Sequence, residues 1–199
     1  LLVCLSGYSQ ISWNAKAGVN ISNVINSGGV NFKPGYQFGV GMDYYFNDHW
    51  GIQPSLLLIS KGFKDKGDYY FPPFMENSEK LKSYDITDNK VYVELPLLLT
   101  YRFNVSEKLK LIFSGGGYIA YGITGKFKNT NTLLDGSKRK DKVDSFSAGV
   151  EKFDTGLAAG AALEYNDKYS IGLSSDFGLK STQARFKNRT YGLSFGYRF

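Results

Sequence analysis

Strict alternation along residues 189–199 constrains the fold of this chain more than any other feature. Large apolar or aromatic side chains occupy every second position: Tyr191, Leu193, Phe195, Tyr197 and Phe199. Glycine, serine and arginine occupy the positions between them. Successive side chains of a strand point to opposite faces. A strand with one large apolar face and one small or charged face is typical of a transmembrane barrel, whose outer face meets lipid and whose inner face meets a polar lumen.

The composition also favours many strands joined by turns. The 199 residues include 23 glycines and 5 prolines, and 16% of them are aromatic, as is common in β proteins. The length indicates one domain. No stretch approaches the roughly 20 apolar residues of a spanning helix. If the chain spans a membrane, it must do so as a closed barrel, because an open sheet edge would leave unpaired backbone groups in lipid.

Alternating segments recur along the chain, and we predict one strand from each. They are residues 12–21, 36–46, 50–62, 90–103, 109–126, 153–165, 169–179 and 189–199. Short connections rich in Asn and Asp (47–49, 104–108 and 166–168) alternate with long polar ones (22–35, 63–89, 127–152 and 180–188). This pattern predicts an all-β fold, an eight-stranded antiparallel up-and-down transmembrane β-barrel with short periplasmic turns and long extracellular loops.

Residues 1–10 resemble the end of a secretory signal peptide, and residues 11–199 then form the barrel domain. Gly7 and Ser9 have the small side chains that a cleavage site prefers. Lipid attachment at Cys4 is the alternative, but Val3 is larger than the residue that normally precedes a lipidated cysteine. On either interpretation the protein is exported, and a barrel of this kind predicts the outer membrane of a Gram-negative cell.

Aromatic residues cluster where the predicted strands meet the short turns. Tyr44, Tyr45, Phe46 and Trp50 flank the first turn. Such rings favour the headgroup region, so we expect them to form part of an aromatic girdle. A soluble sandwich with aromatic strand ends is the alternative.

The opposite parity should line the lumen with charged side chains of both signs. The predicted polar network consists of Lys16, Asp43, Glu94, Arg102, Glu164, Asp176 and Arg198. Eight strands leave an interior just wide enough for side chains to fill. We therefore expect a lumen plugged by ion pairs and hydrogen bonds, with a proton relay or a solute path as the alternative.

Four segments resemble the PorT-like, porin-family outer membrane protein beta-barrel domain: KAGVNISN (16–23), GIQPSLLLISKG (51–62), YVELPLLLTYRF (92–103) and YGLSFGYRF (191–199). The resemblance covers nearly all of the mature chain and implies fold and location rather than an activity. One namesake is linked to a secretion and gliding system. Members of the family often carry an acidic residue where this chain has Ser55, so we expect the polar network of the lumen to pair its side chains differently here.

The final segment also resembles the signal read by the outer-membrane barrel assembly machinery. That signal has a polar residue, a glycine two positions later and aromatic residues at alternate positions. The matching residues are Thr190, Gly192, Phe195, Tyr197 and Phe199.

Candidate catalytic and metal-ligating residues are scarce. His49 is the single histidine and lies in a predicted periplasmic turn, so no Ser–His pair of a lipid A-modifying enzyme can form near the outer rim. One cysteine and one histidine cannot build a zinc cluster. We therefore expect neither enzymatic activity nor a cofactor.

The net charge of +6 raises the question of an anionic partner. Basic residues gather at two predicted outer loops: Lys126, Lys128, Lys138, Arg139, Lys140 and Lys142 at the third, and Lys180, Arg185, Lys187 and Arg189 at the fourth. At that level they could contact the phosphates of lipopolysaccharide, although ordinary solvated loop charge is the alternative. The sequence disfavours nucleic acid as a partner class, because the basic residues are dispersed among acids and no recognition motif is present.

These patterns predict a non-enzymatic outer-membrane barrel with a structural or interaction role and surface-displayed loops. Four alternatives stay open. They are a small-solute channel, an accessory of a secretion system, a soluble lipocalin-like binder and, least favoured, a lipid A-modifying enzyme.

Overall fold

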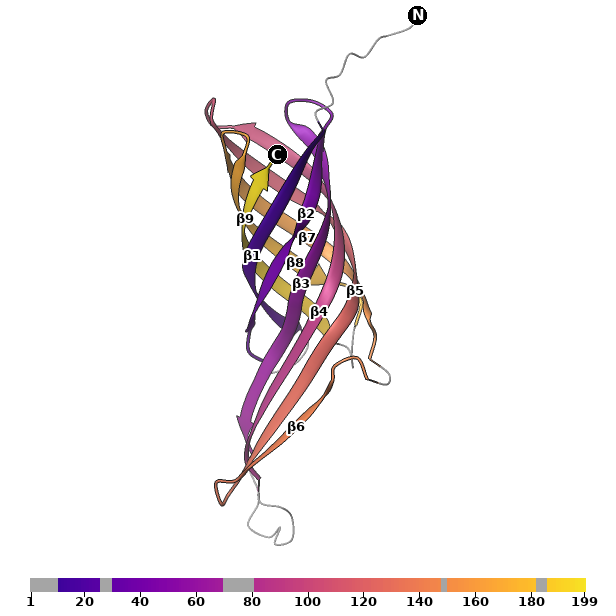
Figure 1. Ribbon diagram of the computed structural model, residues 1–199, viewed down its shortest axis with the longest axis vertical. Helices are drawn as coiled ribbons and strands as arrows, with labels where there is room; N and C mark the ends of the chain where they lie inside the picture. Colours follow the sequence, from indigo (N-terminus) through magenta and orange to yellow (C-terminus); the bar gives the residue numbers. More distant parts are fainter. Residues whose placement is uncertain (1–10, 26–29, 70–80, 148–149, 182–185) are drawn as a thin grey trace, which may run out of the picture.

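The computed structural model describes residues 11–25, 30–69, 81–147, 150–181 and 186–199, which form strands joined by turns (Figure 1). The strands are β1 (Ile11–Ile25), β2 (Lys33–Tyr45), β3 (Trp50–Asp68), β4 (Leu81–Asn104), β5 (Leu109–Leu133), β6 (Lys138–Asp144), β7 (Phe153–Tyr165), β8 (Tyr169–Gly178) and β9 (Lys187–Arg198). The described residues contain no helix that could span a membrane.

Eight of the strands close into a barrel. The order is β4-β3-β2-β1-β9-β8-β7-β5, and the pairing of β4 with β5 completes the ring. Every neighbouring pair is antiparallel, from Ala15↔Val40 between β1 and β2 to Leu97↔Gly117 between β4 and β5. The prediction of an eight-stranded antiparallel barrel is confirmed.

One end of the barrel, here called the turn end, carries the short connections. Asn47 caps the first of them, because its side-chain Oδ1 accepts hydrogen bonds from the backbone N–H groups of His49 and Trp50 at 2.9 and 2.7 Å. Asn166 and Asp167 turn the chain between β7 and β8 with positive φ angles of 54° and 56°. Asn and Asp tolerate this conformation better than other side chains do.

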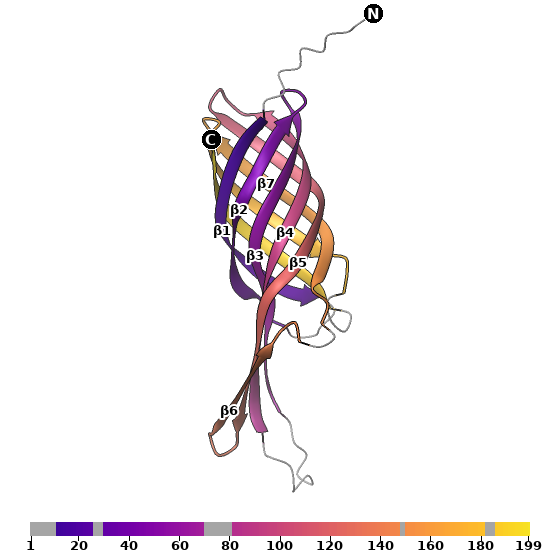
Figure 2. The ribbon, with the colours of Figure 1, turned by 45° about the vertical axis from the view of Figure 1, so that its right-hand side comes forward.

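At the opposite end, here called the loop end, three strands continue well beyond the barrel. β3, β4 and β5 project as a sheet, and β6 pairs with the distal part of β5 to add a fourth strand (Figures 1 and 2). Residues 63–68, 81–89, 127–133 and 138–144 were predicted as loop, so that prediction was wrong. Alternation of apolar and polar residues identifies a strand that has one buried face. Both faces of this extension are exposed to solvent, so its strands lack that alternation.

The barrel wall has two faces of opposite chemistry, as the alternation predicted. Exposed apolar side chains cover the outside of every barrel strand, for example Trp13, Phe38, Leu97 and Leu193. Tyr45 departs from this pattern. It was expected in the aromatic girdle, but it is only 8% exposed and points inward, because its odd position shares the parity of buried Asp43.

The outer apolar face yields a prediction for Leu173, which lies at the middle of β8 and is 64% exposed. Replacing it by arginine should lower the free energy of unfolding from lipid vesicles by about 2–4 kcal/mol, because the charge enters the centre of the lipid layer. A guanidinium titration followed by the fluorescence of Trp13 and Trp50 measures the change.

Leu134→Arg is the matched control. Leu134 is similarly exposed at 59%, but it lies in the turn between β5 and β6, far from the barrel wall. This change should cost less than about 0.5 kcal/mol. Equal losses in the two variants would contradict a lipid-facing position for Leu173.

Candidate functional site: the charged lumen

The lumen concentrates charged side chains of both signs. Within the described part of the chain, cations and acids in similar numbers point into the barrel or its two mouths and are buried or half-buried. They are Lys16, Lys33, Lys61, Lys90, Lys110, Arg102, Arg198, Asp43, Asp88, Glu94, Asp154, Glu164 and Asp176. Charges of opposite sign can neutralise one another in this interior, which a low-dielectric space requires.

The turn-end cluster joins two acids to two arginines. One Arg198 Nη2 atom lies 3.0 Å from Asp43 Oδ2 and 2.6 Å from Glu164 Oε2. Arg102 approaches Glu164 at 3.6 Å, and its guanidinium stacks 3.7 Å from the ring centre of Tyr45. This cation–π contact with Arg102 stabilises Tyr45 in its inward position.

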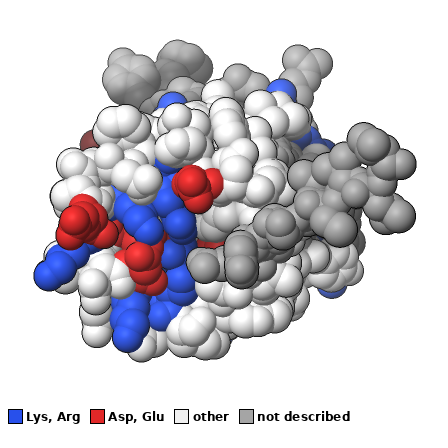
Figure 3. All heavy atoms as spheres, turned by 90° about the horizontal axis from the view of Figure 1, so that it is seen from above, with Lys and Arg blue, Asp and Glu red and all other residues white. Residues whose placement is uncertain are grey.

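Asp43 is the most heavily bonded acid of this cluster. Besides Arg198, it accepts hydrogen bonds from the side-chain amides of Asn14 at 3.0 Å and Gln53 at 2.5 Å. Figure 3 looks onto the turn end and shows basic and acidic side chains next to each other on one part of its surface. The predicted residues Asp43, Arg102, Glu164 and Arg198 are thus brought together at one level of the barrel.

A second cluster, here called the central cluster, surrounds Lys61. The Lys61 ammonium is fully buried and lies 2.5 Å from Glu94, 3.9 Å from Asp176 and 4.0 Å from Asp154. The same ammonium sits 4.3 Å above the ring of Tyr118. A single cation therefore holds three acids from three different strands.

Hydrogen bonds complete the central cluster around Asp154. The Tyr118 hydroxyl donates to its carboxylate at 3.3 Å, and the Asn188 side-chain amide donates at 2.9 Å. Sequence reasoning missed Lys61 and Tyr118. Counting every second residue from buried Gly51 along β3 does lead to Lys61, but the apolar run at 56–59 obscured that parity.

The loop-end mouth of the barrel is capped by the residues that follow β6. Ser145, directly after β6, donates a hydrogen bond of 2.6 Å to Asp88, which is paired with Lys90 at 2.9 Å. The ring of the next residue, Phe146, packs edge-to-face on buried Tyr92 with a centroid separation of 5.8 Å. Gly122 makes room for it, since a Cβ atom there would lie 2.1 Å from the Phe146 ring.

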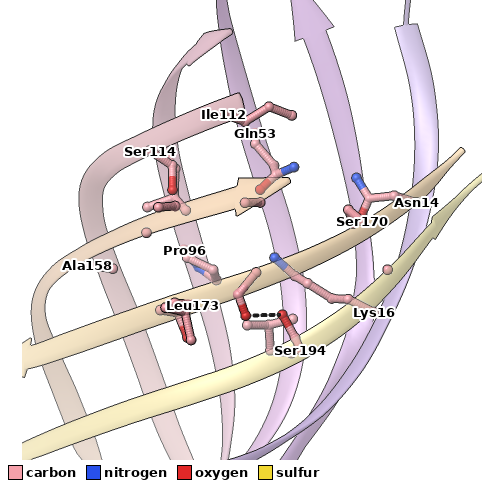
Figure 4. Close-up of a pocket in the computed structure, with 18 of the residues that line it drawn as sticks. Asn14, Lys16, Gln53, Pro96, Ile112, Ser114, Ala158, Ser170, Leu173 and Ser194 are labelled. Carbon is pink, nitrogen blue, oxygen red and sulfur yellow. Dashed lines mark hydrogen bonds between the residues drawn. The ribbon is translucent and has the colours of Figure 1, made fainter. Parts of the chain in front are cut away.

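A cavity of about 130 Å³ separates the turn-end cluster from the central cluster. Lys16 points into it, as do the side chains of Ser114, Ser170 and Ser194 around its wall (Figure 4). Glu94 and Asp176 line it from the central cluster, and Asp43 lines it from the turn end. A polar space of this size can hold a few water molecules, which would solvate the Lys16 ammonium.

The remaining predicted residues are distributed over two surfaces. Lys138, Arg139 and Lys140 lie on β6, and Arg139 pairs with Asp141 at 3.9 Å. Lys187 and Arg189 lie on β9, where Arg189 donates to Asn23 at 3.1 Å. Arg185 and the proposed signal peptide, residues 1–10, lie outside the described residues.

The candidate assembly-signal residues alternate across β9 and its end. Thr190 is almost fully buried, whereas Phe195, Tyr197 and Phe199 are exposed on the outer face. Gly192 belongs to the inward parity and leaves space for the Gln37 side chain, because a Cβ atom would lie 2.7 Å from its amide nitrogen. Recognition by an assembly machinery stays a prediction.

Metal-binding and nucleophilic groupings are not evident in the described part of the chain. No three His, Cys, Asp or Glu residues there are arranged to hold a metal ion. His49 lies exposed at the turn end, where its Nδ1 atom is 3.0 Å from the Arg102 carbonyl oxygen and its ring stacks on Tyr101.

Several solved outer-membrane proteins resemble this structure. The Yersinia pestis attachment invasion locus protein Ail is 20% identical, with 96% of this chain and 99% of that chain covered and a TM-score of 0.45. Neisserial surface protein A is 13% identical, with coverages of 94% and 95% and a TM-score of 0.48. OprG of Pseudomonas aeruginosa is 14% identical, with coverages of 97% and 98% and a TM-score of 0.46.

Sequence comparison with curated proteins yields no match. A family model described as "Outer membrane protein beta-barrel domain", in contrast, matches residues 7–184, which is most of the chain. This match agrees with the closed antiparallel barrel and with its apolar outer face. The protein is thus located in the outer membrane, and it belongs to the outer membrane protein beta-barrel domain family.

Proposed function

We propose that this protein is a non-enzymatic outer-membrane barrel whose lumen is closed by its own side chains and whose projecting sheet is displayed outside the cell for interaction. The turn end then faces the periplasm and the loop end faces the exterior, as is usual for barrels with short turns at one end. The observation that carries the proposal is the fully buried Lys61, held by Glu94, Asp154 and Asp176 across the middle of the barrel.

The central cluster closes the barrel because its partners come from opposite walls. Lys61 extends from β3, while Asp154 and Asp176 extend from β7 and β8. Separating such a buried pair leaves an uncompensated charge in a low-dielectric space, which costs about 3–5 kcal/mol. Tyr92 and Phe146 add an aromatic layer on the loop-end side.

A small-solute channel is the second candidate, and the cavity of about 130 Å³ is the observation that favours it. A solute path would have to pass both the central cluster and the Phe146 cap. Two further roles are supported by fewer observations. The PorT-like affiliation and a secretion-accessory role rest on sequence resemblance alone. A lipid A-modifying role is disfavoured because His49 lies at the turn end, away from the outer leaflet.

Export and assembly follow from the same proposal. Residues 1–10 act as a signal peptide, and the barrel assembly machinery reads the alternating aromatic residues of the last strand. The exposed positions of Phe195, Tyr197 and Phe199 support this reading, because a recognition signal must be accessible.

Conductance provides the direct test of closure. The purified protein should migrate differently on a gel when heated and unheated, as a folded barrel does, and should give no stable current steps in a planar lipid bilayer. Stable single-channel steps from the heat-modifiable species would overturn the closed-lumen proposal and favour the channel.

Lys61→Met tests whether the central cluster holds the barrel together. The change should lower the free energy of unfolding by about 3–5 kcal/mol, because three acids lose their cation. Denaturant titration in vesicles measures this loss. Adding Glu94→Gln should recover part of it, since one of the uncompensated charges is then removed.

Lys66→Met is the matched control for that experiment. Lys66 pairs with Asp85 at 2.7 Å, but both side chains are exposed on the projecting sheet. Its loss should cost less than about 1 kcal/mol, because water screens the pair. A similarly small cost for Lys61→Met would contradict a closing role of the central cluster.

A further inference from the structure

The register of the projecting sheet gathers lysines on one of its faces. Directly opposed residues of antiparallel strands share a face. One row across the four strands runs Lys64↔Thr87↔Lys128↔Lys142. The adjacent pairs Lys126↔Asp144 and Thr130↔Lys140 lie on the same face, because they are offset by two residues along each strand.

We call this surface the lysine face. It contains the basic residues Lys64, Lys66, Lys126, Lys128, Lys138, Lys140 and Lys142, and the acidic residues Asp68, Asp85 and Asp144. The opposite face carries Phe127, Val143, and the pair of Arg139 with Asp141. The sheet is therefore strongly basic on one side only, which the linear order of residues does not reveal.

The lysine face is short of internal partners. Lys66 pairs with Asp85, but within the described part of the chain Lys64, Lys126, Lys128, Lys140 and Lys142 form no ion pair. Lys128 and Lys142 are directly opposed across β5 and β6. Like charges at opposed positions destabilise a sheet. An external anion bound between them would remove that cost.

The position of the lysine face relates it to the membrane surface. On β5, Tyr121 and Ile123 are exposed apolar residues of the barrel wall, and Lys126 and Lys128 follow on the same strand. At about 3.3 Å per residue, these lysines lie about 10 and 17 Å along the strand from Ile123. On β4, Thr87 of the lysine row has the parity of lipid-facing Leu95 and Leu97.

We infer that the lysine face binds the phosphate groups of neighbouring lipopolysaccharide in the outer leaflet, with Lys128 and Lys142 at its centre. The inference rests on the proposed function, because it requires the loop end to lie outside the cell. Clustered ammonium groups suit phosphate. The face begins just beyond the lipid-facing wall, which places it at the depth of glycolipid phosphates rather than far out in solution.

This inference changes the residues expected from sequence to contact lipopolysaccharide. Lys138 and Lys140 belong to the lysine face, but Arg139 lies on the opposite face and is paired with Asp141. Lys64 joins the set, and Lys126, Lys128 and Lys142 of the predicted third loop belong to the lysine face as well. Residues from β3, β5 and β6 meet here because the strands pair, although they are far apart in the chain.

The test compares two double variants that remove the same charge. The first, K128Q/K142Q, removes two charges from the lysine face. The second, K108Q/K168Q, removes two charges from exposed lysines of the turn end. Each protein, folded in zwitterionic detergent, is titrated with rough lipopolysaccharide that carries its lipid A and core phosphates. Native mass spectrometry follows the bound fraction.

K128Q/K142Q should weaken binding by about tenfold, because two charge-assisted contacts are lost. K108Q/K168Q should bind like the unmodified protein, and K128R/K142R should retain binding because the charge is kept. Dephosphorylated lipopolysaccharide should bind the unmodified protein more weakly. The thermal stability of K128Q/K142Q should not fall, since an opposed pair of like charges is removed.

Unchanged affinity in K128Q/K142Q would overturn the inference, as would equal losses in both double variants, which would indicate a general charge effect. Binding of inorganic pyrophosphate as tightly as lipopolysaccharide would overturn the glycolipid as the ligand. The conductance of the same preparations in planar bilayers is measured separately, as a test of the proposed function. Current steps would refute the closed lumen of the proposed function and leave the outcome of the titration unchanged.

Discussion

The narrow interior of an eight-stranded barrel is the constraint on which the rest of this structure depends. Such a lumen has little room beyond its own side chains, and it is shielded from bulk water by the strands and the surrounding lipid. A charge placed there must be paired or solvated by enclosed water, because an isolated buried charge is very costly. The clusters around Arg198 and Lys61 satisfy this requirement at two levels. In the proposed function, pairing of side chains from opposite walls also closes the lumen, so neutrality and closure would arise from the same contacts.

With the lumen closed, as we propose, the expected function lies at the loop end. The cavity near Lys16 lies between the two clusters and suits a few water molecules rather than a large ligand. The projecting sheet, by contrast, offers two large and chemically different faces. Its edge strand β6 is highly charged and every residue in it is exposed. A charged edge opposes pairing with another sheet, so the structure favours contact through the lysine face over addition of a partner strand.

Sequence reasoning identified the barrel strands and much of the lumen, because a lipid-facing wall enforces alternation. Asp43, Arg102, Glu164 and Arg198 were recognised as inward, and they meet in one cluster. Lys61 was missed because the preceding residues 56–59 are all apolar, which hides the period of two. Tyr45 was assigned to the girdle because a tyrosine at a strand end suits the headgroup region. Its parity, which it shares with inward Asp43, marks the inward position, and the contact with Arg102 stabilises it there.

The sequence alone determined the class of fold, since alternating large and small residues in strands of this length are stable in a membrane only as a closed barrel. It also determined which parity faces lipid. The tertiary structure decided which charges become partners, because the register between strands sets that choice and no local pattern encodes it. The same register placed Lys64, Lys128 and Lys142 in one row. Where both faces of a sheet are exposed to solvent, apolar and polar residues do not alternate along its strands. Only the pairing of the strands then shows which residues share a face.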